Sequence, residues 1–280
     1  MPLRKPAVSG SFYPSDPVEL EALIRDCYHH ALGPGRQPPA EVRGDRVAAV
    51  VSPHAGYVFS GPVAAHSYLH LSSLRSPELA IVIGPNHHGL GGGVSSWREG
   101  EWETPLGRMR VDSEASEELR RATGIVDFDP LSHAWEHSVE VQLPFLQQVF
   151  GNQLKVLPIC ISFQDEGTTS LLAEGIAKVA SGRRTLLVAS SDLTHYEPSD
   201  AARSKDSALL EQVKALDVKS FYSTLERLEV TACGYGAIAS VMGACAILGL
   251  TKGEVLKYAN SGDTTKDYTS VVGYPSVRFL

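Results

Sequence analysis

Short runs of branched apolar residues alternate along the chain with longer segments whose apolar positions recur every three or four residues. The short runs are typical of strands covered on both faces, and the longer segments are typical of helices packed on them. The predicted strands are 47–51, 79–83, 154–161, 185–189, 255–259, 270–272 and 277–280, and the predicted helices are 61–71, 114–123, 137–150, 168–180, 199–216 and 234–248. This alternation predicts an α/β fold, with a central mostly parallel or mixed sheet and helices on both faces.

The segment that precedes this pattern predicts one more helix and a loop. Ser15 or Asp16 followed by Pro17 is a good helix start, and this helix is expected to end near Leu32. Residues 33–45 are rich in Gly and Pro and predict a surface loop. About 30 residues cannot form a core alone, so we expect the arm and helix of residues 1–32 to pack on a core of residues 46–280. The prediction is a single domain over residues 1–280, with a hairpin inserted at 97–111.

Composition argues against several classes of protein. The chain is 43% hydrophobic and 20% charged, and its formal net charge of −7 comes with no block of Lys or Arg. We therefore expect no nucleic-acid partner, and no apolar run approaches the ~18 residues that cross a membrane. The N-terminus lacks the apolar core of a signal peptide, and the four cysteines show no paired spacing. A cytoplasmic protein with reduced thiols is expected.

Chemically active side chains follow four of the predicted strands. Open α/β sheets bind ligands in the crevice outside the carboxyl ends of their strands. If the four strands are parallel neighbours, these side chains converge on one edge of the sheet. The residues concerned are His54, His87, His88, Asp192, His195 and Asp263.

Two further segments can contribute to this edge. His137 shares one helical face with His133 and another with Glu140, which offers either a ligand pair or a charge-paired helix start. Cys233 lies where a glycine-rich turn meets an apolar helix. A helix N-terminus lowers the pKa of a thiol, so Cys233 is expected to be a nucleophile or a metal ligand.

Two chemistries fit these residues. Neutral imidazoles from two strand ends and one anionic donor form a metal site with open positions. A thiolate with a His base and an Asp would instead form a Cys-dependent hydrolase or transferase. The metal hypothesis is favoured because it uses more of the histidines. If the site is catalytic, His195 is the expected general acid or base, and Asp192 lies three residues before it. His88 and His137 are then expected around the metal ligands or against the substrate, with Tyr57 and Tyr258 lining the pocket.

Six motifs, in this order, resemble those of the Memo family, whose bacterial and archaeal members are also called AmmeMemoRadiSam system protein B. They are PAVSGSFYP, PHAGYVFSG, IGPNHHG, EHSVEVQLPFL, SSDLTHY and ACGYGAI, and the resemblance extends from Pro6 to the closing strands. The fold of the family is similar to that of LigB-type class III extradiol dioxygenases, which bind non-haem Fe(II). The resemblance therefore implies a LigB-type fold.

The resemblance also ranks the candidate residues. It implies that His54, His87 and Cys233 are metal ligands, that Asp192 and His195 line the pocket, and that His137 lies near it. The extradiol enzymes complete their two histidines with a carboxylate, whereas this chain offers a thiolate. A softer ligand shifts the preference from Fe(II) toward Cu(I) or Zn.

Iron or copper is the expected metal, with zinc as an alternative. The implied functions are a metal-dependent, dioxygenase-like oxidoreductase, or a non-catalytic protein that binds a metal or a partner in the same pocket. The ligand would be a small molecule or a peptide. The resemblance further implies redox control, and an AMMECR-type protein and a radical SAM protein as partners.

Overall fold

Four neighbouring parallel strands form the centre of the molecule. The computed structural model describes residues 2–39 and 47–280. The four strands lie side by side in the order β2 (Val47–Ser52), β9 (Thr185–Ser190), β3 (Leu79–Pro85) and β8 (Lys155–Ile161). Their carboxyl ends therefore meet at the same edge of the sheet.

Shorter or antiparallel strands extend this sheet on both sides. Beyond β2 lies the antiparallel β12 (Val271–Phe279), which also pairs with β10 (His195–Glu197) and β11 (Gly253–Asn260). Beyond β8 lie β4 (Val94–Ser96) and β7 (Asp127–Phe128). A separate three-stranded sheet consists of β1 (Leu3–Arg4), β5 (Glu101–Thr104) and β6 (Gly107–Arg110). The large sheet is therefore mixed because antiparallel strands lie on either side of its parallel centre.

Alternate residues of the central strands belong to two different cores. Ala49 and Val51 of β2 face one core with Ile81 of β3, whereas Val50 and Val82 face the other. Strands buried on both faces need apolar residues at nearly every position, which explains the continuous apolar runs in the sequence.

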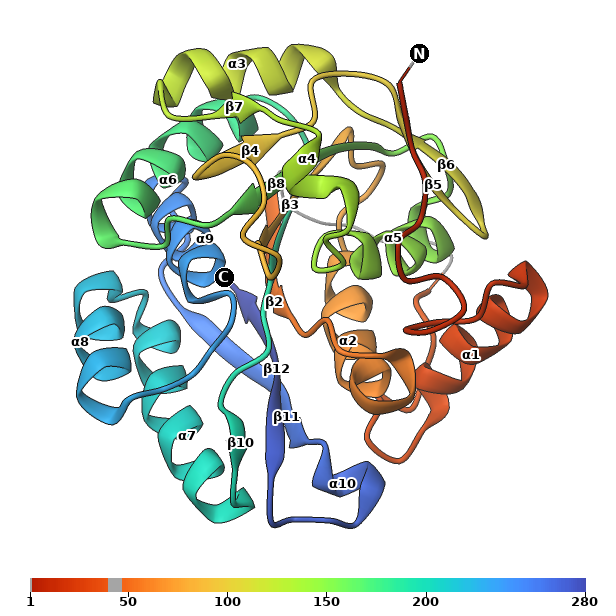
Figure 1. The fold of residues 1–280 in the computed structure, drawn as a ribbon, viewed down its shortest axis with the longest axis vertical. Helices are drawn as coiled ribbons and strands as arrows, with labels where there is room; N and C mark the ends of the chain where they lie inside the picture. The colour runs from red at the N-terminus through yellow and green to blue at the C-terminus, as the bar shows by residue number, and fades with distance from the viewer. Residues whose placement is uncertain (1, 40–46) are drawn as a thin grey trace.

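Helices cover both faces of the sheet (Figure 1). One face carries α3 (Ser113–Thr123), α6 (Glu166–Ala180), α7 (Ser199–Ala215), α8 (Val218–Leu228) and α9 (Tyr235–Ile247). The other carries α1 (Pro17–His29), α2 (Tyr57–Leu71) and α5 (Leu143–Phe150). The short helices are α4 (Leu131–Ala134), the 3-10 turn η1 (Glu140–Gln142) and α10 (Gly262–Thr265). The predicted α/β architecture, with a mixed sheet between two helical layers, is confirmed.

Several element boundaries were predicted wrongly. The segment 137–150 is not one helix: the 3-10 turn η1 covers Glu140–Gln142 and the α-helix α5 begins only at Leu143, with Pro144 in its first turn. The two predicted strands at 270–272 and 277–280 form one strand, β12. Helix α1 ends at His29 and α2 begins at Tyr57, and α8 was not predicted. The predicted hairpin is present as β5 and β6, and the part of the predicted loop at 40–46 lies outside the described residues.

The N-terminal arm is attached to the segment between α4 and α5. Arg4 forms a buried ion pair with Glu140 and donates to the backbone oxygens of His133 and Glu136. The Glu140 carboxylate also accepts the amide hydrogens of residues 7 and 8 and the hydroxyl of Tyr13.

Among the helices that are described, none is long and apolar enough to cross a lipid bilayer.

Candidate metal centre

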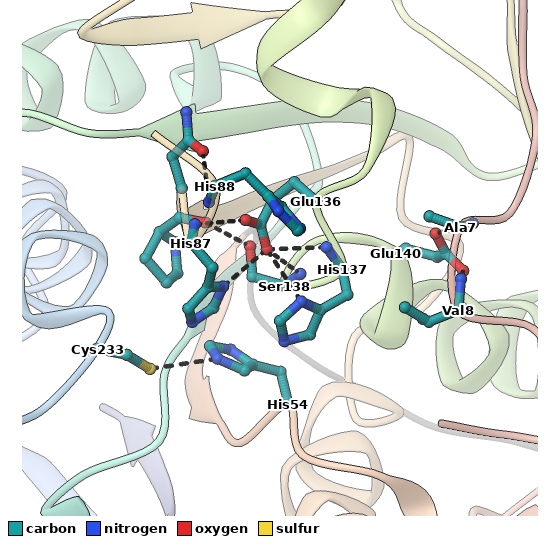
Figure 2. Close-up of polar contacts among 12 residues, drawn as sticks. Ala7, Val8, His54, His87, His88, Glu136, His137, Ser138, Glu140 and Cys233 are labelled. Carbon is teal, nitrogen blue, oxygen red and sulfur yellow. Dashed lines mark hydrogen bonds and ion pairs between the residues drawn. The ribbon is translucent and has the colours of Figure 1, made fainter. Parts of the chain in front are cut away.

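Three donor atoms meet just beyond the carboxyl ends of β2, β9 and β3. His54 follows β2, His87 follows β3, and Cys233 precedes α9. One ligand atom from each of these residues lies within 4.8 Å of the other two. The Cys233 Sγ is 3.2 Å from Nε2 of His54, and the ring centroids of His54 and His87 are 5.2 Å apart. Figure 2 shows the two imidazoles and the thiol pointing toward one another.

Glu136 orients His87. The carboxylate is 2% exposed, and its Oε1 accepts Nδ1–H of His87 over 2.9 Å. Its other oxygen accepts the backbone N–H of the same residue over 2.5 Å. Burial alone would raise the pKa of Glu136, but its hydrogen bond with His87 and its electrostatic interactions with the His87 and His137 rings keep this pKa well below its usual range. The carboxylate is therefore ionised, and Nε2 of His87 is left for another ligand.

His54 is oriented by a hydroxyl group. Its Nδ1 lies 2.9 Å from Oγ of Ser190, the last residue of β9, while its Nε2 faces Cys233. Desolvation lowers the pKa of this imidazole well below its usual value, and electrostatic interaction with the neighbouring His87 and His137 rings lowers it further. His54 is therefore neutral, which is the form that binds metals.

Cys233 is brought to the site by close packing of α9 against the end of β9. A Cβ on Gly234 would lie 2.5 Å from the backbone oxygen of Ser190, so a side chain at position 234 would push the helix away. Gln164 donates to the backbone oxygen of Cys233 and accepts from the amide of Gly236, which fixes the turn before the helix. The segment is thus placed by contacts on both sides.

The Cys233 thiol is not activated by its position. We expected the N-terminus of α9 to lower its pKa, but desolvation raises this pKa well above the usual value, and the nearby charge of Asp192 raises it further. This direction is opposite to the one expected for a helix N-terminus, because loss of solvent penalises the charged thiolate. A neutral thiol 3.2 Å from Nε2 of His54 is within hydrogen-bonding distance of that nitrogen.

Asp192 and His195 both lie on the segment after β9, but they do not form a pair. The buried Asp192 carboxylate accepts the backbone N–H of His54 over 2.9 Å. Desolvation raises the pKa of Asp192 to about 6, and the hydrogen bond from His54 opposes this rise. Nδ1 of the half-buried His195 lies 3.0 Å from the backbone oxygen of Thr231. A carbonyl only accepts, so Nδ1 carries a proton, and Nε2 is the ring nitrogen left for another partner.

His137 forms the opposite wall of the site. Its ring stacks on His87 with 4.5 Å between centroids and meets His54 edge-on at 5.4 Å. Phe12 of the N-terminal arm packs against its ring at 4.7 Å. Desolvation lowers the pKa of His137 to about 4, so this imidazole is neutral at neutral pH.

His87, Glu136 and His137 form a second group with metal-ligand geometry. In this group, Oε1 of Glu136 already accepts three N–H groups, from the His87 ring and from the amides of His137 and Ser138. A metal ion on this oxygen would displace those donors. Glu136 is therefore better explained as a residue that orients His87 than as a ligand.

Several residues predicted at the site make other contacts. The Tyr57 hydroxyl donates to the backbone of residue 141, and the Tyr258 hydroxyl donates to Asp206. His88 is exposed, and Asp263 accepts the backbone N–H of residue 260. None of these, nor the buried His133, belongs to either candidate metal group in the described part of the chain.

Three buried residues that sequence analysis did not single out support the ligand histidines. They are Glu136, Gln142 and Ser190. Glu136 precedes His137 in the sequence, and Ser190 directly follows a predicted strand, but neither position by itself indicates contact with a histidine far along the chain. The signal that could have indicated Glu136 and Ser190 is a carboxylate or hydroxyl side chain at the boundary of an apolar segment.

The donor set fits a metal ion. Metal–nitrogen and metal–sulfur bonds of ~2.0–2.3 Å place the donors of a four-coordinate ion roughly 3.3–3.7 Å apart. The 3.2 Å between Sγ and Nε2 is near that spacing, and small side-chain rotations bring His87 to it from within 4.8 Å. Two imidazoles whose Nδ1 atoms are bonded to buried partners, together with one thiol, make a His₂Cys ligand set.

The fold and this cluster define a class of protein: an α/β protein with a His₂Cys group at the carboxyl edge of its parallel strands. The model of the Memo-like protein family matches residues 4–278, and the chain therefore belongs to the Memo family. It is 47% identical to a MEMO1 family protein of Nitrosopumilus maritimus, over 99% of this chain and 100% of the relative. A MEMO1 family protein of Methanopyrus kandleri is 46% identical over 99% and 98% of the two chains. Another, from Sulfolobus acidocaldarius, is 49% identical over 99% of each.

Proposed function

We propose that this protein binds one redox-capable metal ion, copper or iron, through Nε2 of His54, Nε2 of His87 and Sγ of Cys233. The observation that carries the proposal is the meeting of these three donors within 4.8 Å, from three segments far apart in the sequence. Each imidazole bonds a buried group through Nδ1, so Nε2 is the nitrogen that faces the other ligands.

The ligand types favour particular metals. A thiolate with two imidazoles is a softer set than two imidazoles with a carboxylate, and it suits copper and zinc as well as iron. Of these, copper and iron supply electron-transfer chemistry. Binding would also require loss of the thiol proton, and the positive ion would lie between Sγ of Cys233 and Nε2 of His54.

We further propose that the loaded protein is an oxidoreductase for a small molecule. The bound ion would supply Lewis-acid and electron-transfer chemistry. His195 would accept or release a substrate proton at Nε2, since its Nδ1 is bonded to Thr231. The neutral ring of His137 and the aromatic ring of Phe12 would form the wall against which the substrate packs.

A Cys-dependent hydrolase is the less favoured function. Such an enzyme needs a thiolate at neutral pH, whereas desolvation raises the pKa of Cys233. Asp192, which could orient a base, is instead bonded to the backbone of His54. The metal proposal accounts for the same contacts without requiring an anionic thiol in the free protein.

The test is metal analysis of protein purified without an affinity tag, combined with anomalous scattering from crystals. The expected result is about one equivalent of copper or iron, with its anomalous peak among His54, His87 and Cys233. Oxygen uptake by the loaded protein would then be measured over a panel of small molecules and compared with His195→Ala. A metal peak elsewhere, or full metal content in a His54→Ala/His87→Ala double variant, would refute the proposed site.

A further inference from the structure

A closed network of hydrogen bonds lies behind His54, on the side away from Cys233. Its members are Ser190, Gln142, Tyr68 and the backbone oxygens of Pro53 and Ser138. Ser190, Gln142 and Tyr68 are each 1% exposed or less, so water does not compete for these groups. The network joins the ends of β2 and β9 to α2 and η1.

The orientation of the Gln142 amide is fixed by its neighbours. Nε2 lies 2.9 Å from the backbone oxygen of Pro53, which can only accept a hydrogen bond. Oε1 accepts the Tyr68 hydroxyl over 2.5 Å. A flipped amide would set its oxygen against a carbonyl. Nε2 therefore also donates to Oγ of Ser190, 2.8 Å away.

The Ser190 hydroxyl has only one hydrogen, and the backbone oxygen of Ser138 takes it over 2.6 Å. With the amide of Gln142 donating to the same oxygen, Oγ can only accept from Nδ1 of His54, 2.9 Å away. Nδ1 must then carry the imidazole hydrogen, and Nε2 must be bare.

We propose that Ser190 and Gln142 are positioning residues that fix the tautomer of His54 and so present its Nε2 lone pair to the metal. This inference rests on the proposed function for its metal-binding consequence, while the tautomer itself follows from the network alone. The two ligand histidines are then oriented by different chemistry: a carboxylate acts on His87, and a neutral, fully bonded hydroxyl acts on His54.

The first measurement is nitrogen NMR of His54 in the metal-free protein. The wild type is expected to show hydrogen on Nδ1 and none on Nε2. Ser190→Ala removes the acceptor and is expected to give a mixture of both tautomers. The matched control is Ser116→Ala, which also loses a buried, hydrogen-bonded hydroxyl, but on α3 and away from His54. Hydrogen on Nε2 in the wild type, or an unchanged tautomer in Ser190→Ala, would overturn the proposal.

The second measurement is affinity for Co²⁺, a metal with a visible spectrum. Loss of a group that orients a ligand histidine lowers metal affinity by about 10–100-fold, which is the expected effect of Ser190→Ala. Gln142→Leu is expected to lower it by about tenfold. Its control, Gln147→Leu, removes another buried glutamine with side-chain hydrogen bonds and should stay within about twofold of wild type.

The outcomes separate this inference from the proposed function. If the wild type binds no Co²⁺ but shows the expected tautomer and its loss in Ser190→Ala, the metal proposal fails and the positioning role stands. If folded Ser190→Ala and Gln142→Leu bind Co²⁺ as the wild type does, the positioning role fails and the metal site stands. Circular dichroism of all four variants verifies that each is folded.

Discussion

His87 donates from Nδ1 to the carboxylate of Glu136 over 2.9 Å, and the same carboxylate accepts the backbone N–H of His87. One buried acidic side chain thus fixes both the ring and the main chain of a candidate ligand. The same oxygen that accepts the ring N–H also accepts the amides of His137 and Ser138. The segments after β3 and after α4 are therefore joined through a single residue.

Replacing Glu136 should weaken both the fold and the metal site. In Glu136→Gln, one carboxylate oxygen becomes an NH₂ group that must face an N–H donor, so we expect a loss of about 2–3 kcal/mol in the free energy of unfolding. Metal affinity should fall by about 10–100-fold. Urea unfolding and Co²⁺ titration measure these two effects. Glu118→Gln, in the half-exposed pair with Arg183, is the control and should change neither by much.

Metal binding should raise the melting temperature. An ion that binds only the native state at 100 times its dissociation constant stabilises it by about 2.7 kcal/mol. The rise should be lost in His54→Ala, His87→Ala and Cys233→Ala. It should persist in His29→Ala, because His29 lies at the end of α1 and its ring hydrogen-bonds Gln37 instead of any residue of the proposed site. A rise of equal size in all four variants would mean that the metal binds at other positions.

Strand direction explains how the ligand candidates could be predicted from sequence. His54 and His87 each lie two residues past the end of a strand, and parallel strands bring such positions to one edge. Cys233 could be predicted as a candidate from its position in the turn before an apolar helix. Glu136 and Ser190 could not be predicted in this way, because their roles depend on contacts with residues 49 and 136 positions away in the sequence. Contacts between residues so far apart leave no periodic pattern in the sequence.

The Cys233 thiol should react slowly in the metal-free protein. Because desolvation raises its pKa, little thiolate is present near neutral pH, and iodoacetamide should label it at least about tenfold more slowly at pH 8 than an unhindered thiol. Peptide mass spectrometry follows the labelling, and urea-unfolded protein provides the reference rate. Rapid labelling of the folded protein at pH 7 would instead support the Cys-dependent hydrolase.

The ion pair that attaches the N-terminal arm should be worth more than an exposed one. Removal of one partner from a buried pair leaves an uncompensated charge and costs about 3–5 kcal/mol. We expect this loss for Arg4→Met, since Glu140 is fully buried. The exposed pair of Arg278 with Glu254 gives the comparison, and Arg278→Met should cost less than about 1 kcal/mol. If urea unfolding shows a loss for Arg4→Met as small as that expected for Arg278→Met, the ion pair contributes little to the attachment of the arm.

Acid should destabilise the protein partly through His133. Its side chain is fully buried beside Trp97 and Trp102, and neither ring nitrogen has a hydrogen-bond partner among the described residues. Desolvation and the charge of Arg4 lower its pKa to about 3, with Glu136 opposing this shift. Above the unfolded-state pKa of about 6.5, His133 is unprotonated in both the folded and the unfolded chain, so its contribution to the free energy of unfolding does not change with pH.

Below that pH the unfolded chain binds a proton at His133 that the folded chain does not. The free energy of unfolding should therefore fall by up to about 1.4 kcal/mol per pH unit between pH 6 and pH 4 on account of this residue. His133→Leu retains the apolar contacts and cannot titrate, so its stability should fall less steeply than that of wild type over the same range. His30→Leu, at the exposed end of α1, should retain the wild-type slope. If His133→Leu also has the wild-type slope in urea titrations at pH 4, 5, 6 and 7, the imidazole of His133 is already protonated in the folded protein.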